Sequence, residues 1–457
     1  MTDFVIAVPE RCVRILDTLN DAGFEAYVVG GCVRDSLLGR IPSDWDITTS
    51  ARPEEVTALF RRTVPTGIKH GTVTVLSGKE SYEVTTYRID GSYGDGRHPD
   101  SVTFTGSLRE DLMRRDFTVN AMAYSPRDGL VDFFDGTGDM QKHVLRAVGD
   151  PEERFREDAL RIMRAVRFSA QLDYSIEEKT LGALSGLVPT LRRISAERIR
   201  TELSKLLLSG HPEKLFLLDE TGILDVIMPE LALCLKTPQH NPHHCFSVGE
   251  HIIRSVCAVR ADQVLRLTML FHDLGKPACR TTDEDGIDHF HGHAQVSADL
   301  ALSIMKRLKY DNASIDDVVL LVKNHDLKIE DDARSVRRAV NRVGERMFPL
   351  LLEVKRADLA AQSDYQREEK ARHLDRIEEL FRKVLEEKDC VSLKTLAVGG
   401  RELMAWGEKP GREMGRVLQA MLDDVLETPG HNERTYLEQA YRAGRYRPED
   451  QPAEEDH

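Results

Sequence analysis

The sequence predicts an α+β multidomain fold, in which a mixed-sheet head is followed by an all-helical remainder. Short apolar or alternating segments bounded by glycine extend to about residue 145, which is typical of strands. From Pro151 onward the apolar residues recur with helical spacing instead. The chain of 457 residues is also too long for one hydrophobic core, so several domains are expected.

The head is predicted as a series of short helices and strands. We expect a helix over 11–22, a buried strand over 26–31, a helix over 32–39 closed by Gly39, a strand over 45–50, and strands over 71–76 and 82–88. Residues 77–80 join the last two strands as a hairpin. The segment between Tyr87 and Phe104 is rich in Gly, Asp and Pro, which indicates a mobile loop.

The helical remainder divides where prolines cluster. Pro229, Pro238 and Pro242 indicate a boundary near 225–242, and a histidine-rich helical segment follows. Beyond it the chain is helical and highly charged, and its last dozen residues are predicted to be disordered. The predicted domains are a head over 1–146, a neck over 147–228, a histidine-rich domain over 229–365 and a tail over 366–457.

The composition indicates a soluble globular protein, with 41% hydrophobic and 31% charged residues. We find no run of eighteen apolar residues and no signal peptide, so neither a membrane partner nor secretion is expected. The seven cysteines are scattered without a C-x-x-C pair. That pattern favours free thiols in a reducing cytoplasm over disulfides or a structural zinc site.

The formal net charge of −14 counts against a nucleic-acid partner when it is taken alone. Binding to a phosphate backbone needs only a local basic surface, however. One such surface is predicted from the arginines early in the helical remainder, namely Arg154, Arg156, Arg161, Arg164, Arg167, Arg192, Arg193, Arg198 and Arg200. The alternative is a helix surface on which these arginines form salt bridges.

Asp44 and Asp46 are candidates for a metal-dependent active site in the head. They lie two apart on a predicted strand, so their side chains leave the same face. Two carboxylates on one face can hold the hard cations that assist a phosphoryl displacement. By itself this pair could equally be a polar strand edge, and Glu83, a candidate third carboxylate or general base, could be an exposed strand residue.

Gly30 and Gly31 add a candidate phosphate site beside these carboxylates. They precede a predicted helix start, whose free N–H groups and positive dipole end suit a triphosphate. Arg34 lies one turn into this helix and can add a charge-assisted contact.

These residues carry a resemblance to a known family. The pattern Gly30-Gly31-x-x-Arg34-Asp35 followed by Asp44-Trp45-Asp46 resembles motif A of the polymerase-beta-like nucleotidyltransferase superfamily. Three further segments resemble motifs of the class II tRNA nucleotidyltransferase and bacterial poly(A) polymerase family. They are RRDFTVNA at 114–121, FDG-x-x-D at 134–139, and EDALR at 157–161 with RAVRF at 164–168. All four motifs occur in the family's order between about residues 26 and 170.

The resemblance implies roles for residues in these motifs. Arg115, Asp116 and Asn120 would contact ribose hydroxyls and phosphate, with Asp116 and Asn120 on one face if their stretch is helical. The alternative for Asp116 is a helix cap. The resemblance also makes Asp135-Gly136 a hinge between the head and the neck.

The fourth motif suggests how the nucleotide is selected. Asp158 and Arg161 are three apart, so on one helix face they could read the pairing edge of the base. Cytosine and adenine both present an amine beside an acceptor nitrogen, whereas guanine and uracil do not. Arg164 and Arg167 in the same motif are further nucleotide-binding candidates. The alternative is an ordinary intrahelical salt bridge between Asp158 and Arg161.

A loop in the head bears on the product. By resemblance, family members that add the final A carry a loop where this chain has residues 88–103, and CC-only members lack it. The loop is intact here, with Arg97-His98-Pro99-Asp100 in its centre. This favours full CCA addition or A addition over CC addition.

The histidine-rich segment contains a second set of candidate ligands. FHDLGKP at 271–277 resembles the signature of HD phosphohydrolases, and the other ligand types follow in order. By this resemblance one divalent transition metal would be held by His251, His272, Asp273 and Asp358, while His293 and His325 would serve a second metal or bind phosphate. The implied activity is hydrolysis of a phosphomonoester or phosphodiester, such as a 2′,3′-cyclic phosphate. The alternatives are a structural scaffold, and a first ligand among His240, His243 and His244.

The tail offers short motifs. Residues 399–404 and 409–415 resemble the tail of certain CCA-adding enzymes, in which helices cradle the tRNA elbow. The alternative is a packing unit without RNA contact.

Together the resemblances imply an enzyme that adds C, C and A to the 3′ end of tRNA from CTP and ATP, with Mg²⁺ in the head. An A-adding specialist and a bacterial poly(A) polymerase are the nearest alternatives, although the acidic end PEDQPAEEDH argues against the second. A phosphohydrolase whose head only binds RNA, and a pure RNA-binding protein, are alternatives from other classes. The oligomeric state is not indicated by the sequence.

Overall fold

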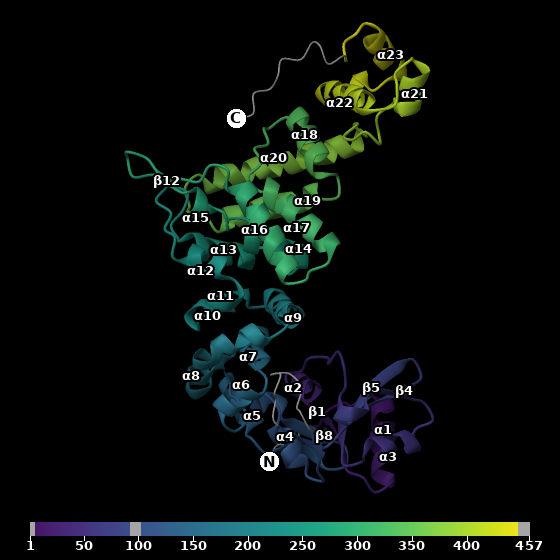
Figure 1. Ribbon diagram of the computed structural model, residues 1–457, viewed down its shortest axis with the longest axis vertical. Coiled ribbons are helices and arrows are strands. Elements are labelled where there is room, and N and C mark those ends of the chain that lie inside the picture. The colour runs from purple at the N-terminus through teal and green to yellow at the C-terminus, as the bar shows by residue number, and fades with distance from the viewer. Residues whose placement is uncertain (1–4, 92–101, 447–457) are drawn as a thin grey trace. The chain divides into compact units, whose positions relative to one another are not determined.

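The structure is a computed structural model that describes residues 5–91 and 102–446. The chain forms two compact units, Met1–Ala232 and Leu233–His457 (Figure 1). The division lies close to the predicted boundary between the neck and the histidine-rich domain. The predicted head and neck share the first unit, and the predicted histidine-rich domain and tail share the second, so their separation remains a prediction.

The first unit is built on a mixed seven-stranded sheet with the order β3-β4-β5-β2-β1-β8-β9. Its strands are β1 (Ala26–Val29), β2 (Ile47–Thr49), β3 (Thr63–Gly67), β4 (Thr72–Ser77), β5 (Glu80–Thr86), β8 (Met122–Ser125) and β9 (Gly129–Asp132). Only the pairing of β2 with β5 is parallel within this sheet; the others are antiparallel. The predicted mixed sheet is therefore confirmed.

Local sequence explains the helices that flank this sheet, which are α1 (Glu10–Asp21), α2 (Gly31–Leu37), α3 (Pro53–Leu59), α4 (Leu108–Met113) and α5 (Gly136–Lys142). α1 buries Cys12, Ile15, Leu16 and Leu19, which share one helical face. The predicted helix over 32–39 is confirmed as α2, and Gly39 follows it in the left-handed region at φ +70°. The predicted hairpin is confirmed. β4 and β5 pair from Thr72 opposite Thr85 to Ser77 opposite Glu80.

Two predictions about the head are wrong in detail. The strand expected over 45–50 begins only at Ile47, so Asp44 and Asp46 precede it. The predicted loop after Tyr87 is shorter than expected, because β6 (Arg88–Asp90) and β7 (Val102–Phe104) pair with each other. Alternating β-branched and polar residues at the two ends form this ladder despite the glycine-rich centre. Arg97, His98, Pro99 and Asp100 lie outside the described residues.

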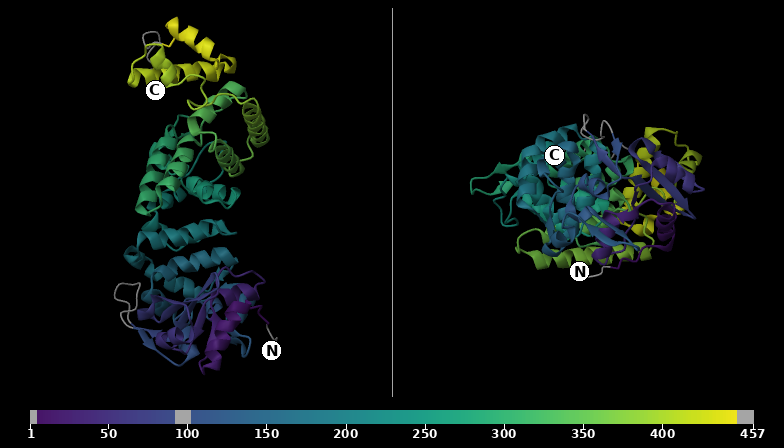
Figure 2. Two further views of the ribbon diagram at one scale, coloured as in Figure 1. Left: turned by 90° about the vertical axis from the view of Figure 1, so that its right-hand side faces the viewer. Right: turned by 90° about the horizontal axis from the view of Figure 1, so that it is seen from below.

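The rest of the first unit is helical, as predicted, apart from a short pairing of β10 (Val144–Leu145) with β11 (Ser175–Ile176). Its helices are α6 (Pro151–Glu157), α7 (Leu160–Leu172), α8 (Glu178–Leu187), α9 (Ala196–Leu207), α10 (Leu215–Glu220), α11 (Leu224–Ile227) and α12 (Pro229–Leu235), the last of which continues into the second unit. α7 is buried along most of its length and packs against α9. In Figure 2 these helices are coloured blue to teal.

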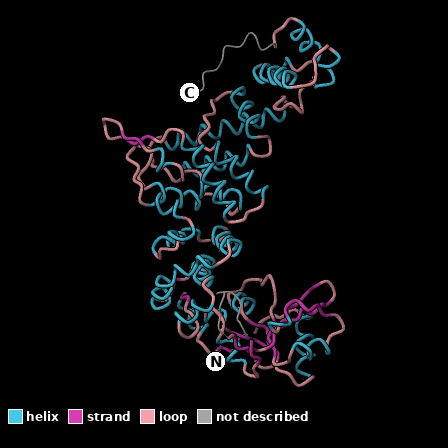
Figure 3. The backbone as a smooth tube through the Cα atoms, viewed as in Figure 1, coloured by secondary structure: helices cyan, strands magenta, loops and turns pink. Residues whose placement is uncertain are grey.

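The second unit is helical apart from one small hairpin (Figure 3). Its helices are α13 (Val248–Ala258), α14 (Gln263–Phe271), α15 (Lys276–Cys279), α16 (His293–Arg307), α17 (Asn312–Asn324), α18 (Ala333–Val343), α19 (Phe348–Ala360), α20 (Arg367–Glu386), α21 (Gly400–Ala405), α22 (Arg412–Glu427) and α23 (Arg434–Arg442). The hairpin of β12 (Thr281–Thr282) and β13 (Asp288–His289) was not predicted. It closes on a glycine, Gly286, with φ +79°.

Several short 3₁₀ helices complete the chain: η1 (Ile68–His70), η2 (Thr118–Asn120), η3 (Val188–Arg193), η4 (Pro212–Lys214) and η5 (Pro429–His431). All seven cysteines are free thiols, as predicted. Within the described ranges, no helix combines the length and the apolar character that crossing a lipid bilayer requires.

Candidate functional site

A polar pocket in the first unit gathers most of the predicted nucleotidyl-transfer residues. Predicted residues that line it are Gly30, Gly31, Arg34, Asp44, Asp46, Arg115, Asp116, Asn120, Arg164 and Arg167. These residues come from α2, the segment before β2, the segment around η2, and α7. The structure thus brings together motifs that are more than a hundred residues apart.

Asp46 immediately precedes β2, and Glu83 lies within the parallel strand β5. Ile47 pairs with Val84 in the parallel register of β2 and β5, so Asp46 and Glu83 occupy corresponding positions just before them. The backbone carbonyl of Asp46 accepts a hydrogen bond of 2.9 Å from Val29, which holds this segment in extended form. Burial in the pocket raises the pKa of Asp46, the charges of Asp44 and Glu83 raise it further, and Arg115 opposes them. Mutually repelling carboxylates of this kind are the donor set that suits Mg²⁺.

Gly30 allows a close contact with Arg115 in the lining of the pocket. Its φ of +83° lies in the left-handed region, and a Cβ atom there would come within 2.9 Å of the Arg115 guanidinium. Burial lowers the pKa of Arg115, whereas Asp111, Asp46 and Asp116 favour its charged form. Gly30 therefore makes room for a partly buried cation next to the carboxylates.

Asp116 and Asn120 meet as predicted, but not through an α-helix. Phe117 is extended and only Thr118–Asn120 forms a 3₁₀ turn. Asn120 nevertheless donates a hydrogen bond of 3.0 Å from Nδ2 to Asp116, and its own Oδ1 accepts from Arg34. The backbone N–H of Phe117 also donates to Asp116.

Arg164 completes this network from α7. Its Nε donates to Asp116 Oδ2 at 2.7 Å. Burial alone would raise the pKa of the Asp116 carboxyl, but Arg164 and Asn120 outweigh it and hold the pKa well below its usual range. Asp116 therefore stays ionised and joins the head to α7.

Asp158 and Arg161, the predicted base-reading residues, do not share the expected helix face. Asp158 ends α6 and precedes α7, so it shares no helix face with Arg161. Its carboxylate accepts from Leu160 N–H and pairs with Arg198 at 2.6 Å. Arg161 instead donates to the backbone carbonyls of Arg154 and Arg114 and pairs with Glu157. The break between α6 and α7, which the spacing alone did not reveal, places Asp158 outside the helix that carries Arg161.

Most arginines of the predicted basic surface form ion pairs with carboxylates, which was the alternative interpretation. Arg154, Arg156, Arg161, Arg164, Arg167 and Arg198 pair with carboxylates. The Arg167 guanidinium pairs with the buried Glu202 at 2.6 Å and lies 3.8 Å from the centroid of the Phe168 ring. Burial lowers the pKa of Arg167 to about 10.

The sequence did not single out several other residues of this pocket. Arg40, Gln171 and Lys205 line it together with the predicted residues. They belong to no recognised motif, and only their basic or amide chemistry could have drawn attention to them.

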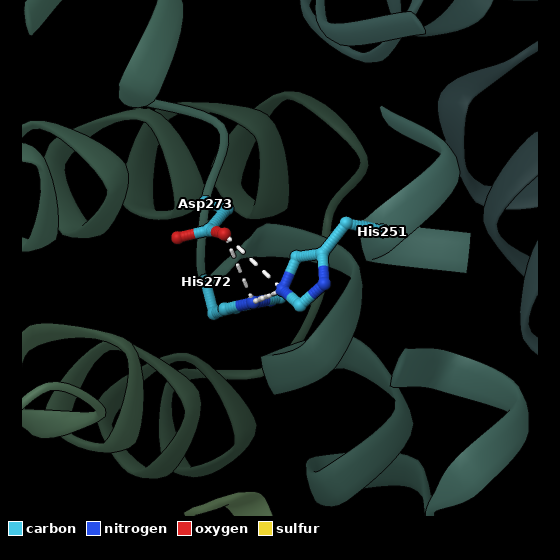
Figure 4. Close-up of side chains that lie close together, drawn as sticks. All are labelled: His251, His272 and Asp273. Carbon is cyan, nitrogen blue, oxygen red and sulfur yellow. Dashed lines mark hydrogen bonds and ion pairs between the residues drawn. The ribbon is translucent and has the colours of Figure 1, made fainter. Parts of the chain in front are cut away.

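A second cluster lies in the second unit and contains all six predicted metal ligands. His251 is on α13, His272 and Asp273 follow α14, His293 begins α16, His325 ends α17, and Asp358 is on α19. Figure 4 shows His251, His272 and Asp273 turned toward one another. Three of the six, His251, His272 and Asp273, offer ligand atoms within 4.8 Å of one another, and so do Asp273, His293 and His325.

Backbone carbonyls orient all four histidine rings. The Nδ1 atoms of His251, His272, His293 and His325 lie 2.7 to 3.2 Å from the carbonyls of Ala361, Met269, Phe290 and Val322. A neutral ring that donates from Nδ1 carries its lone pair on Nε2. These carbonyls therefore direct four Nε2 lone pairs inward, as in histidines that bind metals.

The two oxygens of Asp273 face different partners. Its Oδ2 lies 3.4 Å from His251 Nε2 and 3.3 Å from His272 Nε2. Its Oδ1 lies 3.3 Å from His293 Nε2 and 3.5 Å from His325 Nε2. Asp358 joins the first set, 3.0 Å from His251 Nε2.

The imidazole nitrogens and carboxylate oxygens of this cluster fit a divalent metal ion. Asp273 Oδ1 is buried without a hydrogen-bond donor among the described residues, and the Nε2 atoms of His251 and His272 approach to 3.2 Å. Acceptor atoms this close are stabilised by a cation between them. Imidazole with carboxylate favours a mid-row transition metal.

His244 does not replace His251 as a ligand. Its ring packs on His251 at 4.8 Å between centroids, and its Nε2 lies 3.5 Å from Lys276 Nζ. Burial and the charge of Lys276 lower the pKa of His244 to about 3. Among the described groupings of candidate ligands, none includes His240, His243 or His244.

Comparisons with known proteins agree with the head motifs. Residues 26–146 match the family described as Poly A polymerase head domain, and residues 173–235 match the probable RNA and SrmB-binding site of polymerase A. Residues 281–440 match a family described as tRNA nucleotidyltransferase domain 2, putative.

Curated relatives match somewhat less than half of the chain. The CCA-adding enzyme of Lactobacillus helveticus is 55% identical over 206 residues, which are 45% of this chain and 52% of that protein. The CCA-adding enzyme of Leuconostoc mesenteroides is 56% identical over 208 residues, 46% of this chain and 51% of that protein. The chain thus spans about half the length of the curated relatives it matches.

Solved structures extend the likeness over the whole chain. The Bacillus stearothermophilus CCA-adding enzyme in complex with CTP is 29% identical, with a TM-score of 0.69, and the match covers 95% of this chain and 98% of that one. The Thermotoga maritima CCA-adding enzyme complexed with tRNA shares the fold. It is 21% identical, with a TM-score of 0.58, and the match covers 95% of this chain and 96% of that one.

The mixed sheet and the carboxylates Asp44, Asp46 and Asp116 all lie within residues 26–146, the region that matches the Poly A polymerase head domain. Over nearly its whole length the chain is similar to CCA-adding enzymes, and its head is similar to that of poly(A) polymerases.

Proposed function

We propose that this protein adds C, C and A to the 3′ end of tRNA, with CTP and ATP as donors and pyrophosphate as the leaving group. The observation that carries this proposal is the single pocket in which Asp44 and Asp46 face Arg115, Asp116 and Arg164. The names of the relatives and the CTP bound to the Bacillus enzyme support it. The reaction belongs in the cytoplasm, where these relatives' substrate matures.

In this proposal Asp44 and Asp46 hold Mg²⁺, and Glu83 assists. Bound Mg²⁺ supplies charge stabilisation for the transferred phosphoryl group. Arg34 and Arg115 face the same pocket and neutralise triphosphate oxygens. Asp116 and Asn120 present hydrogen-bonding groups to the ribose, held in place by Arg164.

Base selection by Asp158 and Arg161 requires a rearrangement. Asp158 would have to leave Arg198, and Arg161 would have to leave Glu157 and two backbone carbonyls. Arg164 and Arg167 line the pocket, but they too are engaged with carboxylates, those of Asp116 and Glu202. We therefore infer that nucleotide binding, not the free protein, assembles the pair.

The test is a nucleotide-addition assay with purified protein, Mg²⁺ and tRNAs ending before CCA, after C and after CC. Addition of CC and then A, stopping there, supports the proposal. Addition of A alone to the CC-ended tRNA would identify an A-adding specialist, and a long A tail would identify a poly(A) polymerase. The absence of any addition would leave only an RNA-binding head.

We further propose that the second unit hydrolyses a phosphomonoester or phosphodiester. The support is the cluster around Asp273, whose Oδ1 faces His293 and His325 while its Oδ2 faces His251 and His272. His251, His272, Asp273 and Asp358 would hold a divalent transition metal there, which would supply an activated water for hydrolysis at phosphorus. Lys276, 2.7 Å from Asp273, adds positive charge beside this cluster.

The two proposed sites can be separated by substitution. Asp44→Ala should abolish nucleotide addition and spare hydrolysis, while Asp273→Ala should do the reverse. Each variant is assayed for both activities. Loss of both activities in a folded variant would contradict two independent sites. Contact between the tail and tRNA stays a prediction, although its two motifs do form α21 and the start of α22.

A further inference from the structure

Three side chains outside the metal ligands form a polar and aromatic edge beside the second-unit cluster. We call His243, Tyr365 and Lys370 the rim. Lys370 Nζ donates to His243 Nδ1 at 3.1 Å and to Gln362 Oε1 at 3.2 Å. The Gln362 amide in turn donates to Asp358 Oδ2 at 3.2 Å. One side chain therefore separates the rim ammonium from a predicted metal ligand.

The segment between α19 and α20 fixes the aromatic part of the rim. Ser363 donates from its backbone N–H to the His243 carbonyl at 2.9 Å, and from its hydroxyl to the Pro242 carbonyl at 2.6 Å. These bonds bring the rings of His243 and Tyr365 to 5.0 Å between centroids. Tyr365 remains 49% exposed, so much of its ring is open to a ligand.

A second path ties the rim to the metal cluster. His244, the neighbour of His243, packs on the predicted ligand His251. Its ring also contacts Lys276, which pairs with Asp273. The rim is thus tied to the cluster through Asp358 and through His251.

The chemistry of the rim suits a nucleotide. Two of the three N–H groups of Lys370 are engaged, by His243 and Gln362, and an ammonium has a third for a phosphate oxygen. An exposed tyrosine offers a face on which any base can stack. An ammonium and an aromatic ring next to a phosphate-hydrolysing centre match a phosphate joined to a nucleoside.

We propose that the rim is the nucleotide-recognition subsite of the second-unit centre. A nucleobase stacks on the exposed ring of Tyr365, which His243 contacts edge to face, and Lys370 contacts a phosphate oxygen. The centre therefore prefers phosphates attached to a nucleoside over the same phosphate without a base. This inference rests on the proposed hydrolase activity and names its substrate class.

The test compares two cyclic phosphodiesters that differ only by the nucleoside. Adenosine 2′,3′-cyclic phosphate and glycerol 1,2-cyclic phosphate are offered to the full-length, metal-loaded protein. We expect Tyr365→Ala to lower the ratio of kcat/KM for the nucleotide to that for the glycerol diester about tenfold, mainly through KM. Lys370→Met should raise KM for the nucleotide, and Lys370→Arg should restore it. An unchanged ratio in Tyr365→Ala would overturn the inference.

Leu393→Ala is the matched control, because Leu393 is 47% exposed in the same unit and lies outside the rim. It should leave the ratio as in the wild type. A trinucleotide with a terminal cyclic phosphate separates two sources of the ligand. A larger effect of Tyr365→Ala on the trinucleotide would indicate an RNA end, and an equal effect would indicate a single nucleotide.

A protein that hydrolyses neither diester would refute the proposed hydrolase. The rim would then be tested by equilibrium dialysis of labelled adenosine 2′,3′-cyclic phosphate, with CTP present to fill the head pocket. Weaker binding by Tyr365→Ala than by wild type would keep the rim as a nucleotide site. Equal binding by both proteins would overturn it.

Discussion

Asp116 shows how a single side chain can join distant parts of the chain. Its carboxylate accepts hydrogen bonds from Phe117, Asn120 and Arg164, which lie on the head and on α7. The carboxylate is buried, so its charge depends on these donors. A change at this residue affects both stability and nucleotide binding.

Asp116→Asn should destabilise the protein by about 2–3 kcal/mol at pH 7, because Arg164 loses a charged partner in a buried setting. Folding holds the pKa of Asp116 below its ordinary value near 4. The pair therefore stabilises the native state above that pH, and the contribution is lost as the pH falls through the lowered pKa. Urea unfolding at pH 7 and at pH 3 measures the change.

Asp21→Asn serves as the control for this substitution. Asp21 pairs with Arg127 on the surface, with 71% of its side chain exposed. The expected loss is at most about 0.5 kcal/mol. A difference between wild type and Asp116→Asn that persisted undiminished at low pH would contradict the electrostatic explanation.

Gly30→Ala should impair nucleotide addition through Arg115. Both the positive φ and the approach of the Arg115 guanidinium to 2.9 Å oppose a Cβ atom. Gly23→Ala is a matched control, since Gly23 has φ +89° but no atom within 4 Å of the added Cβ. Backbone strain of about 1–2 kcal/mol is expected in both variants. A fall in addition rate for Gly30→Ala alone would identify displacement of Arg115 as the cause.

At the scale of elements, helix ends place the predicted metal ligands of the second unit. His272 and His325 end α14 and α17, His293 begins α16, and Asp358 lies in the last turn of α19. Lys355, one turn before Asp358, donates to the carbonyls of His325 and Leu327 at 2.9 and 2.7 Å. This lysine satisfies carbonyls that the end of α17 leaves free and ties α17 to α19.

Lys355→Met should lower the stability of the second unit by about 1–3 kcal/mol, because two carbonyls lose a buried charged donor. The metal content of the purified protein should fall as well, since His325 is no longer held relative to Asp358. Chemical unfolding and metal analysis measure the two effects. Lys383→Met on the exposed face of α20 is the control and should change neither. An unaltered metal content in Lys355→Met would show that His325 is placed without Lys355.

At the scale of the whole molecule, the proposed sites fall in separate compact units. A ligand that binds only a folded unit raises the stability of that unit, by about 2.7 kcal/mol at a hundred times its dissociation constant. CTP with Mg²⁺ should therefore raise the unfolding temperature of the first unit, and a transition metal that of the second. Calorimetry should resolve two transitions that respond separately. A rise in the unfolding temperatures of both transitions with CTP alone would contradict this prediction.

The sequence was sufficient for the features that depend on local patterns. Alternation predicted the β4–β5 hairpin, apolar spacing predicted α1, and helical spacing after Pro151 predicted the helical remainder. Motif order placed Asp44, Asp46 and Asp116 in one pocket, and ligand types placed the residues around Asp273 together. These predictions held because residue identity and spacing restrict the local backbone and the chemistry that a site can perform.

Other features were decided by tertiary contacts. The spacing of Asp158 and Arg161 suggested a pair, but the break before α7 gave them Arg198 and Glu157 as partners. The arginines after Pro151 offered a basic surface, but neighbouring carboxylates paired with most of them. The sequence by itself therefore determined which residues could bind nucleotide or metal. Only the tertiary structure decided which partner each one has, because charged side chains in a folded chain pair with whatever opposite charge packing brings within reach.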